Sequence, residues 1–283
     1  MKSIIYSFVV MYVLAFAVSS ADAALIGSWR QDEALGPLID STGGHPPGVA
    51  TGSPTYGQPG VPNGTYGAIN VTNAAGTAIE YGPSEVDEFF TIGADNNNPV
   101  MNLPATGTFT VMGWVNPAAP TVAGRTYRFL STGSAAGADR GWGIGLRLNN
   151  TAGTGSAIRF TNYGIADNDS SVFDVAFGNW VHVAATYNNG QINYFLNGNA
   201  LDSDTSAFGN EGAAARLVVG GRLGGNDTDQ MNGVVDGVQV YNEVLTADQI
   251  RQAAASSVSV PEPSSTMLLG VIGCVAVARR RRR

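Results

Sequence analysis

The segment that most restricts the fold of this chain is NWVHVAATYNNGQINYFLNGNAL, at residues 179–201. Apolar and polar side chains alternate along two short runs, which is the period of a β-strand rather than of a helix. The pair Asn189-Gly190 separates the runs, and both residues tolerate the positive φ of a type I′ hairpin turn. A second such pair, Asn197-Gly198, turns the chain again. We therefore predict antiparallel strands joined by tight turns.

Other segments extend this pattern. In TFTVMGWVNP, at residues 108–117, Phe109, Val111 and Val115 share one face while Met112 and Trp114 share the other. Because both faces are apolar, this strand is predicted to lie inside the sheet. Residues 215–221 and 231–241 predict two more strands.

One short helix is expected after the last strand. Thr246 and Gln249 have the spacing of a capping box, and Leu245 can pack on Ile250. We expect the helix to begin at Ala247 and to end near Ser256. Residues 256–259 then form a polar linker.

The composition agrees with a β-rich fold. The chain contains 37 glycines and 13 prolines among 283 residues, which suits many short strands joined by turns. No internal repeat is evident, so we expect residues 24–255 to form a single domain. The only cysteine, Cys274, lies outside that domain, so the domain must be stable without a disulfide.

The first 23 residues are predicted to be a secretory signal peptide. Lys2 supplies the positive start, residues 4–18 are apolar, and Ala21-Asp22-Ala23 provides the small residues of a cleavage site. We therefore expect the mature chain to begin at Ala24.

The exported part of the chain is acidic. Six of the 15 basic and two of the 22 acidic residues lie outside residues 24–259, which leaves 9 and 20 and a net charge of about −11. This part contains no lysine. An acidic surface repels phosphate backbones and anionic lipids, so nucleic acid is excluded as a partner, while neutral sugars or divalent cations fit better.

The last 24 residues, VPEPSSTMLLGVIGCVAVARRRRR, combine a Pro-Glu-Pro motif, a short apolar run and five arginines. The apolar run would rise about 18 Å as a helix, against roughly 30 Å of hydrocarbon, so it is a marginal membrane anchor. The arginines would stay on the cytoplasmic side.

This terminal segment resembles the PEP-CTERM sorting signal of Gram-negative bacteria. The resemblance implies that an exosortase recognises Pro261, Glu262 and Pro263, and that the apolar run and the cluster Arg279, Arg280, Arg281, Arg282 and Arg283 complete the signal. It implies a destination at the cell surface or in the extracellular matrix, with the C-terminus anchored in the membrane transiently or permanently.

The strand segments, together with SWRQDEALGPLIDSTGG at residues 28–44, resemble the concanavalin A-like lectin/glucanase superfamily, in its bacterial laminin G-like type. The resemblance implies an all-β jelly roll of two antiparallel sheets. Where that family has two consecutive aspartates before the last strand, this chain has Asp236-Gly237.

We expect no catalytic activity. Hydrolases of this superfamily place Glu, Asp and Glu at alternate positions of one strand, so that all three share a face. In EVDE, at residues 85–88, Glu85 and Asp87 would share a face but Glu88 would not. His45 lacks a partner motif, and His182 alternates within a strand, where a structural imidazole is expected.

Calcium is the expected cofactor, because it prefers oxygen ligands and the exported part is rich in carboxylates. The resemblance implies a structural calcium held by Asp236 and an acidic residue near the mature N-terminus. Glu33 and Asp40 are the candidates at that end. Asp236 could instead cap a turn.

Aromatic side chains are the candidates for sugar contacts. Trp29, Trp114 and Trp180 lie in strand patterns that favour core packing. Trp142 lies between two glycines after a polar loop, and we predict that it is exposed and contacts ligand.

Three functions stay open. The chain is a non-catalytic surface module that binds polysaccharide or another matrix polymer, a divergent glycoside hydrolase on the same fold, or a structural coat component without a small ligand.

Overall fold

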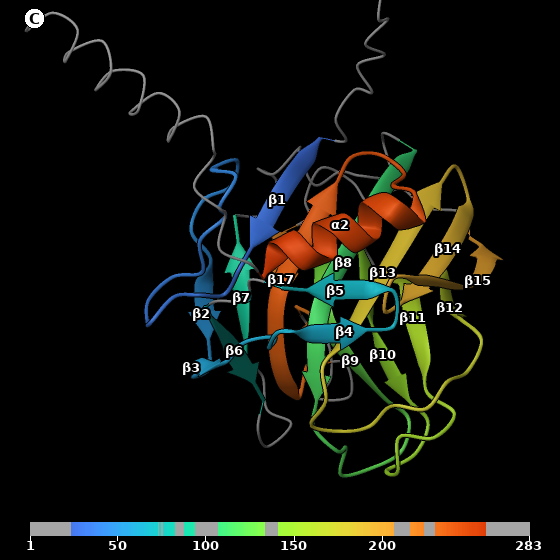
Figure 1. Ribbon diagram of the computed structural model, residues 1–283, viewed down its shortest axis with the longest axis horizontal. Coiled ribbons are helices and arrows are strands. Elements are labelled where there is room, and N and C mark those ends of the chain that lie inside the picture. Colours follow the sequence, from blue (N-terminus) through green and yellow to red (C-terminus); the bar gives the residue numbers. More distant parts are fainter. Residues whose placement is uncertain are drawn as a thin grey trace, which may run out of the picture.

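The computed structural model describes residues 24–72, 74, 76–82, 88–93, 107–133, 141–206, 216–223 and 230–258. Within them the chain forms two antiparallel sheets, a separate two-stranded hairpin and one helix (Figure 1). The two sheets pack face to face, which confirms the predicted all-β sandwich.

The first sheet has eight strands in the order β15-β14-β13-β8-β17-β6-β3, and β1 also pairs with β17. Its strands are β1 (Leu25–Trp29), β3 (Thr55–Pro59), β6 (Thr77–Tyr81), β8 (Thr108–Pro117), β13 (Val181–Asn188), β14 (Gln191–Leu196), β15 (Asn199–Thr205) and β17 (Gly233–Tyr241).

The second sheet has seven strands in the order β12-β11-β10-β9-β16-β7-β2. Its strands are β2 (Val49–Thr51), β7 (Phe89–Ile92), β9 (Arg125–Gly133), β10 (Trp142–Leu148), β11 (Ala157–Asn162), β12 (Ala166–Asp169) and β16 (Arg216–Val219).

The predicted hairpin is confirmed. Asn188 pairs with Gln191 across the turn, and Asn189 and Gly190 both have positive φ, at 46° and 103°. Asn197 and Gly198 turn the chain in the same way, with φ of 50° and 74°, and lead into β15. Strand β8 lies between β13 and β17, as its two apolar faces predicted.

The main hydrophobic core lies between the sheets. Phe109, Val111 and Val115 of β8 point into it from one sheet, and Phe129 and Ile144 point into it from the other. All five side chains are fully buried.

The outer face of the eight-stranded sheet is covered by the helix α2 (Ala247–Ser257) and by the hairpin of β4 (Gly64–Tyr66) and β5 (Ile69–Val71) (Figure 1). Trp114 of β8 packs there against Ile69 and Ala254, and its Nε1 donates to the Ala254 carbonyl oxygen at 3.0 Å. Met112, two residues earlier, packs against Ile250 of the helix.

The helix begins where the sequence predicted. The hydroxyl of Thr246 accepts from the Gln249 amide, and the Gln249 side chain accepts from the Thr246 amide, which completes the capping box. The helix ends at Ser257, so the first two residues of the predicted linker belong to the helix.

The structure shows why a glycine, Gly237, follows Asp236 at the position where the resembling family has a second aspartate. The φ of Gly237 is 54°, and a Cβ atom there would lie 2.4 Å from Oγ of Ser257 in the helix. A side chain at this position would therefore collide with the Ser257 side chain and would be strained by the positive φ.

The predicted signal peptide and sorting signal, including Pro261, Glu262, Pro263 and residues 279–283, lie outside the described residues. In the described part of the chain, no helix has both the length and the hydrophobicity required to cross a membrane.

Candidate functional site

The outer face of the seven-stranded sheet carries charged and small side chains over β10, β11 and β12. In β10, Trp142, Ile144 and Leu146 belong to the core, and the intervening Gly143, Gly145 and Arg147 therefore face outward. The same alternation places Arg159 and Thr161 of β11 on this face. Asp167 and Asp169 of β12 lie beside them. We call this surface the outer face of β10–β12.

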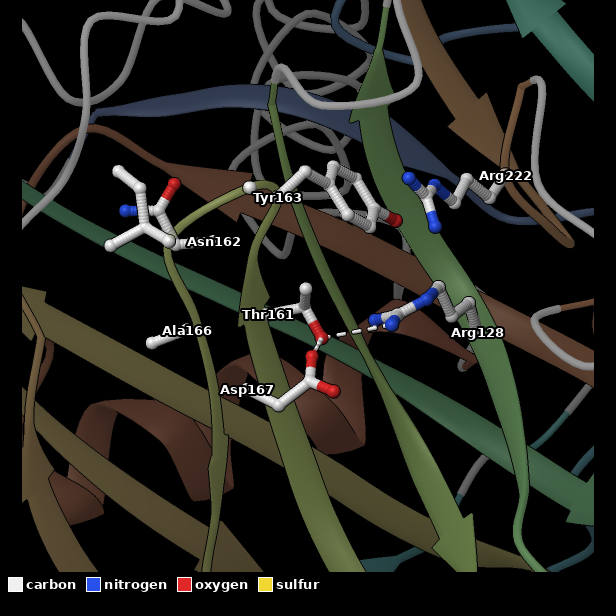
Figure 2. Close-up of a pocket in the computed structure, with 9 residues that line it drawn as sticks. Arg128, Thr161, Asn162, Tyr163, Ala166, Asp167 and Arg222 are labelled. Carbon is white, nitrogen blue, oxygen red and sulfur yellow. Dashed lines mark hydrogen bonds between the residues drawn. The ribbon is translucent and has the colours of Figure 1, made fainter.

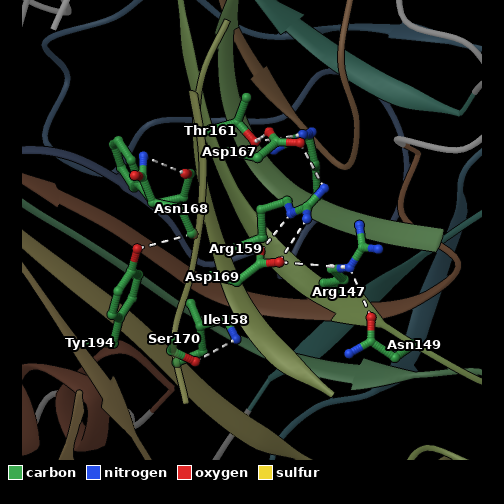
Figure 3. Close-up of polar contacts among 12 residues, drawn as sticks. Arg147, Asn149, Ile158, Arg159, Thr161, Asp167, Asn168, Asp169, Ser170 and Tyr194 are labelled. Carbon is green, nitrogen blue, oxygen red and sulfur yellow. Dashed lines mark hydrogen bonds and ion pairs between the residues drawn. The ribbon is translucent and has the colours of Figure 1, made fainter. Parts of the chain in front are cut away.

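A network of ion pairs crosses this face (Figure 3). The Arg159 guanidinium binds Asp169 through two hydrogen bonds, of 2.6 and 2.7 Å, and binds Asp167 through a third, of 2.8 Å. Arg147 lies 3.7 Å from the same Asp169 carboxylate. Because these side chains are partly exposed, the network adds little to stability, but it fixes the positions of the charges.

An open hollow of about 370 Å³ lies at one end of this face. Figure 2 shows the side chains that surround it. Its lining includes Arg128, Thr161, Tyr163, Ile165, Asp167 and Arg222.

Hydrogen bonds link the floor of the hollow to the ion-pair network. Nη2 of the buried Arg128 donates to the Thr161 hydroxyl at 2.8 Å, and that hydroxyl donates to Asp167 at 2.6 Å (Figure 2). The Arg222 guanidinium lies 3.9 Å from the centre of the Tyr163 ring, and the Arg128 guanidinium lies 5.2 Å from it. Both distances are those of cation–π contacts.

Gly143 makes room for this arrangement. A Cβ atom there would lie 2.6 Å from the Tyr163 hydroxyl oxygen and 3.1 Å from Nη1 of Arg128. The absence of a side chain at this position therefore allows the tyrosine and the arginine to meet.

This site was not among the sites predicted from the sequence. The signal was present in RFTNYGIADND, where Arg159 and Thr161 alternate along one strand and Asp167 and Asp169 alternate along the next. Read as a hairpin, this pattern would have placed all four on one face.

Trp142, the residue predicted to contact ligand, is fully buried, so the prediction that it is exposed is wrong. Its ring stacks on Phe160 at 5.9 Å and on Phe109 at 5.6 Å between centroids. The flanking glycines suggested an open loop. Instead, Gly143 faces outward and Trp142 takes the inward position of the same strand. Trp29 and Trp114 are fully buried, as expected, and Trp180 is partly buried against the Trp114 cluster.

The three predicted calcium ligands lie in different hydrogen-bond environments. Glu33 accepts from the Ile39 amide at 2.8 Å, and burial raises its pKa. Asp236 accepts from the Val61 amide at 3.2 Å, and burial raises its pKa to about 8.

Asp40 is surrounded by donors, which include the Ser28 amide, the Thr42 hydroxyl and Nδ1 of His45, the last at 2.8 Å. Burial raises the pKa of Asp40, but the hydrogen bonds outweigh it and the net shift is downward. Among the described residues, no three or more His, Cys, Asp and Glu side chains are grouped so that they could hold a metal ion. Calcium binding by Glu33, Asp40 and Asp236 therefore stays a prediction.

The two histidines have structural surroundings. His182 is fully buried beside the Trp114 ring, 5.0 Å away between centroids, and burial lowers its pKa to about 3. It is neutral at physiological pH, in agreement with the structural role that we expected. His45, for which the sequence shows no partner motif, lies with Nδ1 2.8 Å from the Asp40 carboxylate.

Of the acidic segment at residues 85–88, the structure describes only Glu88. Glu85 and Asp87 lie outside the described residues. Glu88 is buried and accepts from the Gly82 amide at 2.7 Å.

Several solved structures share this fold. Domain 4 of AbnA, a GH43 extracellular arabinanase from Geobacillus stearothermophilus solved in complex with arabinotriose, is 20% identical, with a TM-score of 0.54 over 82% of this chain and 98% of that one. The binding domain of Paraclostridial Mosquitocidal Protein 1 is 15% identical, with a TM-score of 0.50 over 81% of this chain and 51% of that one.

A sialidase from Trypanosoma rangeli in complex with sialic acid is 17% identical, with a TM-score of 0.55 over 84% of this chain and 34% of that one. The chain thus spans about a third of the sialidase. At these identities the likeness shows the fold alone. No curated protein sequence matches the chain.

Two family models match the sequence. The PEP-CTERM protein-sorting motif matches residues 259–283, which indicates an exported protein that an exosortase processes at its C-terminus. The model of the concanavalin A-like lectin/glucanases superfamily, in its laminin G-like form, matches residues 91–251. Because that match covers more than half of the chain and the two antiparallel sheets agree with it, the chain belongs to the concanavalin A-like lectin/glucanases superfamily.

Proposed function

We propose that this protein is a non-catalytic module that binds a polysaccharide or another extracellular matrix polymer on the outer face of β10–β12. The observation that carries the proposal is the open hollow at Tyr163, where an aromatic ring, a hydroxyl group and two guanidinium groups meet. A site with an apolar ring and a few fixed polar groups is typical of sugar recognition.

The shape of the site also supports a polymer as ligand. The hollow is open, and its lining residue Asp167 pairs with Arg159, which joins it to the neighbouring ion pairs of Arg159 and Arg147 with Asp169. An open site on a sheet can bind one sugar residue while the rest of the chain runs past it. A closed cavity would require a free small molecule.

A divergent glycoside hydrolase is the second candidate, because Asp167 and Asp169 occupy alternate positions of β12. Glycoside hydrolysis requires one carboxyl group to donate a proton while the other acts as nucleophile or base. Both of these carboxylates bind Arg159, so we assign neither a catalytic role.

The sorting motif supports a destination at the cell surface or in the extracellular matrix of a Gram-negative bacterium. In this proposal the apolar run before the arginines holds the protein in the membrane until the exosortase acts, or permanently. The acidic body then faces outward, where it meets the host exopolysaccharide.

A retention experiment tests the proposed function. The full-length chain is passed over immobilised β-glucans, galactans and host exopolysaccharide, and the eluate is analysed for released oligosaccharide. We expect retention on at least one polymer without release of sugar. Released oligosaccharide would favour the hydrolase, whereas no retention on any polymer would favour a structural coat component.

A further inference from the structure

The first described residue of the chain is held beside the end of β17. The Ala24 amide nitrogen donates to Oε1 of Glu243 at 2.9 Å, and the Asn242 amide nitrogen donates to the Ala24 carbonyl oxygen at 3.2 Å. The next residue, Leu25, pairs with Tyr241 in the sheet. Figure 1 shows this start of β1 beside the end of β17, where the chain turns toward α2. Both backbone polar atoms of Ala24 are therefore bound by the far end of the domain sequence.

Glu243 is itself held in place by β8. The Thr110 hydroxyl donates to the Glu243 carbonyl oxygen at 2.7 Å, and it accepts from the Leu245 amide at 2.9 Å. Thr110 is fully buried in the eight-stranded sheet. The backbone that carries Glu243 is therefore fixed by a buried side chain, and its carboxylate is presented to Ala24 from a fixed position.

Removal of the predicted signal peptide would change the chemistry of this contact. Hydrolysis of the peptide bond between Ala23 and Ala24 consumes one water, so that Ala23 keeps a carboxylate and Ala24 gains an α-amino group. With an ordinary pKa of about 7.7–8.0, that group binds a proton near neutral pH. The contact joins a neutral amide to a carboxylate before cleavage, and after cleavage it joins two opposite charges.

The position of the cut matters at the level of a single residue. Consecutive Cα atoms lie about 3.8 Å apart, so an additional residue before Ala24 would move the α-ammonium group away and leave a neutral amide beside Glu243. A cut one residue later would remove the donor atom altogether. Only a chain that begins at Ala24 places its positive end on the atom that contacts Oε1 of Glu243.

The contact restrains the end of a strand that belongs to the core. The first residues of most domains are poorly ordered unless another element holds them. Strand β1 joins the sheet through β17, with an irregular register between Leu25 and Gly27, and it carries the fully buried Trp29 into the core. A restraint at Ala24 therefore also holds the strand that contributes this tryptophan.

From these contacts we propose that cleavage after Ala23 completes the fold, because the new α-ammonium group of Ala24 forms an ion pair with Glu243. The pair joins the start of β1 to the segment between β17 and α2. It belongs to the eight-stranded sheet and does not depend on the proposed polysaccharide binding.

The composition of the chain allows this one amino group to be observed directly. Lys2 is the only lysine and lies in the predicted signal peptide, so the processed chain has a single primary amine. The N-terminal residue of the exported, processed chain is first identified by mass spectrometry. Reductive methylation with ¹³C-formaldehyde then labels the Ala24 nitrogen alone, and NMR measures its pKa.

The matched control is Glu243→Gln, which keeps the size of the side chain and a hydrogen-bond acceptor but removes the charge. We expect the pKa of the Ala24 α-amino group to be higher in the parent than in this variant by about 0.3–0.7. The titratable side chains of the described segments that pack against Ala24 are those of Glu243 and Tyr241. Burial raises the pKa of Tyr241 to about 12, so its hydroxyl stays neutral during the titration.

A second measurement tests whether the pair stabilises the fold. One alanine inserted directly before Ala24 in the processed chain should lower the melting temperature of the parent by about 1–2 °C and leave that of Glu243→Gln unchanged. Because the pair raises the pKa of the α-amino group, its contribution is present below about pH 8 and is lost as the pH rises through the folded-state pKa. The effect of the insertion should therefore disappear by about pH 10.

Each result decides the matter separately from polysaccharide binding. Equal α-amino pKa values in the parent and Glu243→Gln, an exported chain that begins at a residue other than Ala24, or a melting temperature that does not respond to the inserted alanine would overturn the inference. The proposed function would then still stand.

Discussion

The two outer faces of this sandwich differ in what covers them. On the eight-stranded sheet, Trp114 and Met112 point away from the core between the sheets and are nevertheless fully buried, because α2 and the β4–β5 hairpin lie over them (Figure 1). On the seven-stranded sheet, the corresponding outward positions of β10–β12 hold glycine, arginine and aspartate.

The covered face therefore serves mainly the stability of the fold, whereas the open face of β10–β12 is the one available for recognition. The covered face contributes to folding through apolar burial, whereas the face of β10–β12 contributes fixed charges and an open hollow beside Tyr163. Changes on the covered face should therefore unfold the protein. Changes on the face of β10–β12 should alter ligand binding and leave the fold intact.

The largest effect is expected for Trp114→Ala on the covered face. The substitution removes a fully buried ring and its hydrogen bond to the Ala254 carbonyl oxygen, so the free energy of unfolding should fall by about 3–5 kcal/mol. Denaturant unfolding measures the change. A loss below about 1 kcal/mol would show that the helix does not stabilise this face.

Calcium, if bound as predicted by Glu33, Asp40 and Asp236, would add to the stability of the sandwich independently of the face of β10–β12. Chelation with EDTA should then lower the melting temperature by about 5–10 °C, because a ligand in hundredfold excess over its dissociation constant stabilises by about 2.7 kcal/mol. The control is Asp236→Asn, which should no longer respond to EDTA. An identical melting curve of the parent with and without EDTA would rule the calcium out.

Acid should lower the free energy of unfolding because of His182, which lies on the covered face. Burial lowers its folded-state pKa to about 3, while the unfolded chain takes up the proton near pH 6.5, so protonation favours unfolding. Stability should fall by about 1.4 kcal/mol for each pH unit between these two values. In His182→Leu this contribution should disappear, and parallel pH profiles of parent and variant would contradict the assignment.

The smallest effect on stability, and the sharpest test of the comparison, is expected for Gly143→Ala. The added methyl group would meet the end of the Tyr163 side chain and Nη1 of Arg128, both of which can shift, so the free energy of unfolding should change by less than about 1 kcal/mol. Retention on the bound polymer should nevertheless fall, because the pair that forms the hollow is displaced. Unchanged retention would remove the hollow from the binding site.

The sequence predicted the elements of the fold better than it predicted the site. The bounds of β8, the turn at Asn189-Gly190 and the first residue of α2 all follow from local patterns, and the structure confirms them. The superfamily model begins only at residue 91, yet β1, β2, β3 and β6 precede it and belong to the two sheets. Strand pairing, such as that of β1 with β17, is set by contacts between distant residues, and no local pattern reports them.

Trp142 and Arg159 show why the site was harder to predict from the sequence than the fold. The glycines beside Trp142 suggested exposure, but the direction of a strand side chain depends on which face meets the other sheet. The alternation in RFTNYGIADND could have placed Arg159 on one face with Asp167 and Asp169, but its ion pairs with both aspartates depend on how β11 pairs with β12.

What the sequence determined by itself is the strands within residues 108–117, 179–201, 215–221 and 231–241, the two Asn-Gly turns and the helix cap, because alternation, positive-φ residues and capping act over a few neighbouring residues. Only the tertiary structure decided which sheet face is covered and which is open. That choice depends on where α2 and the β4–β5 hairpin pack, and their contacts with Trp114 join residues that are far apart in the chain.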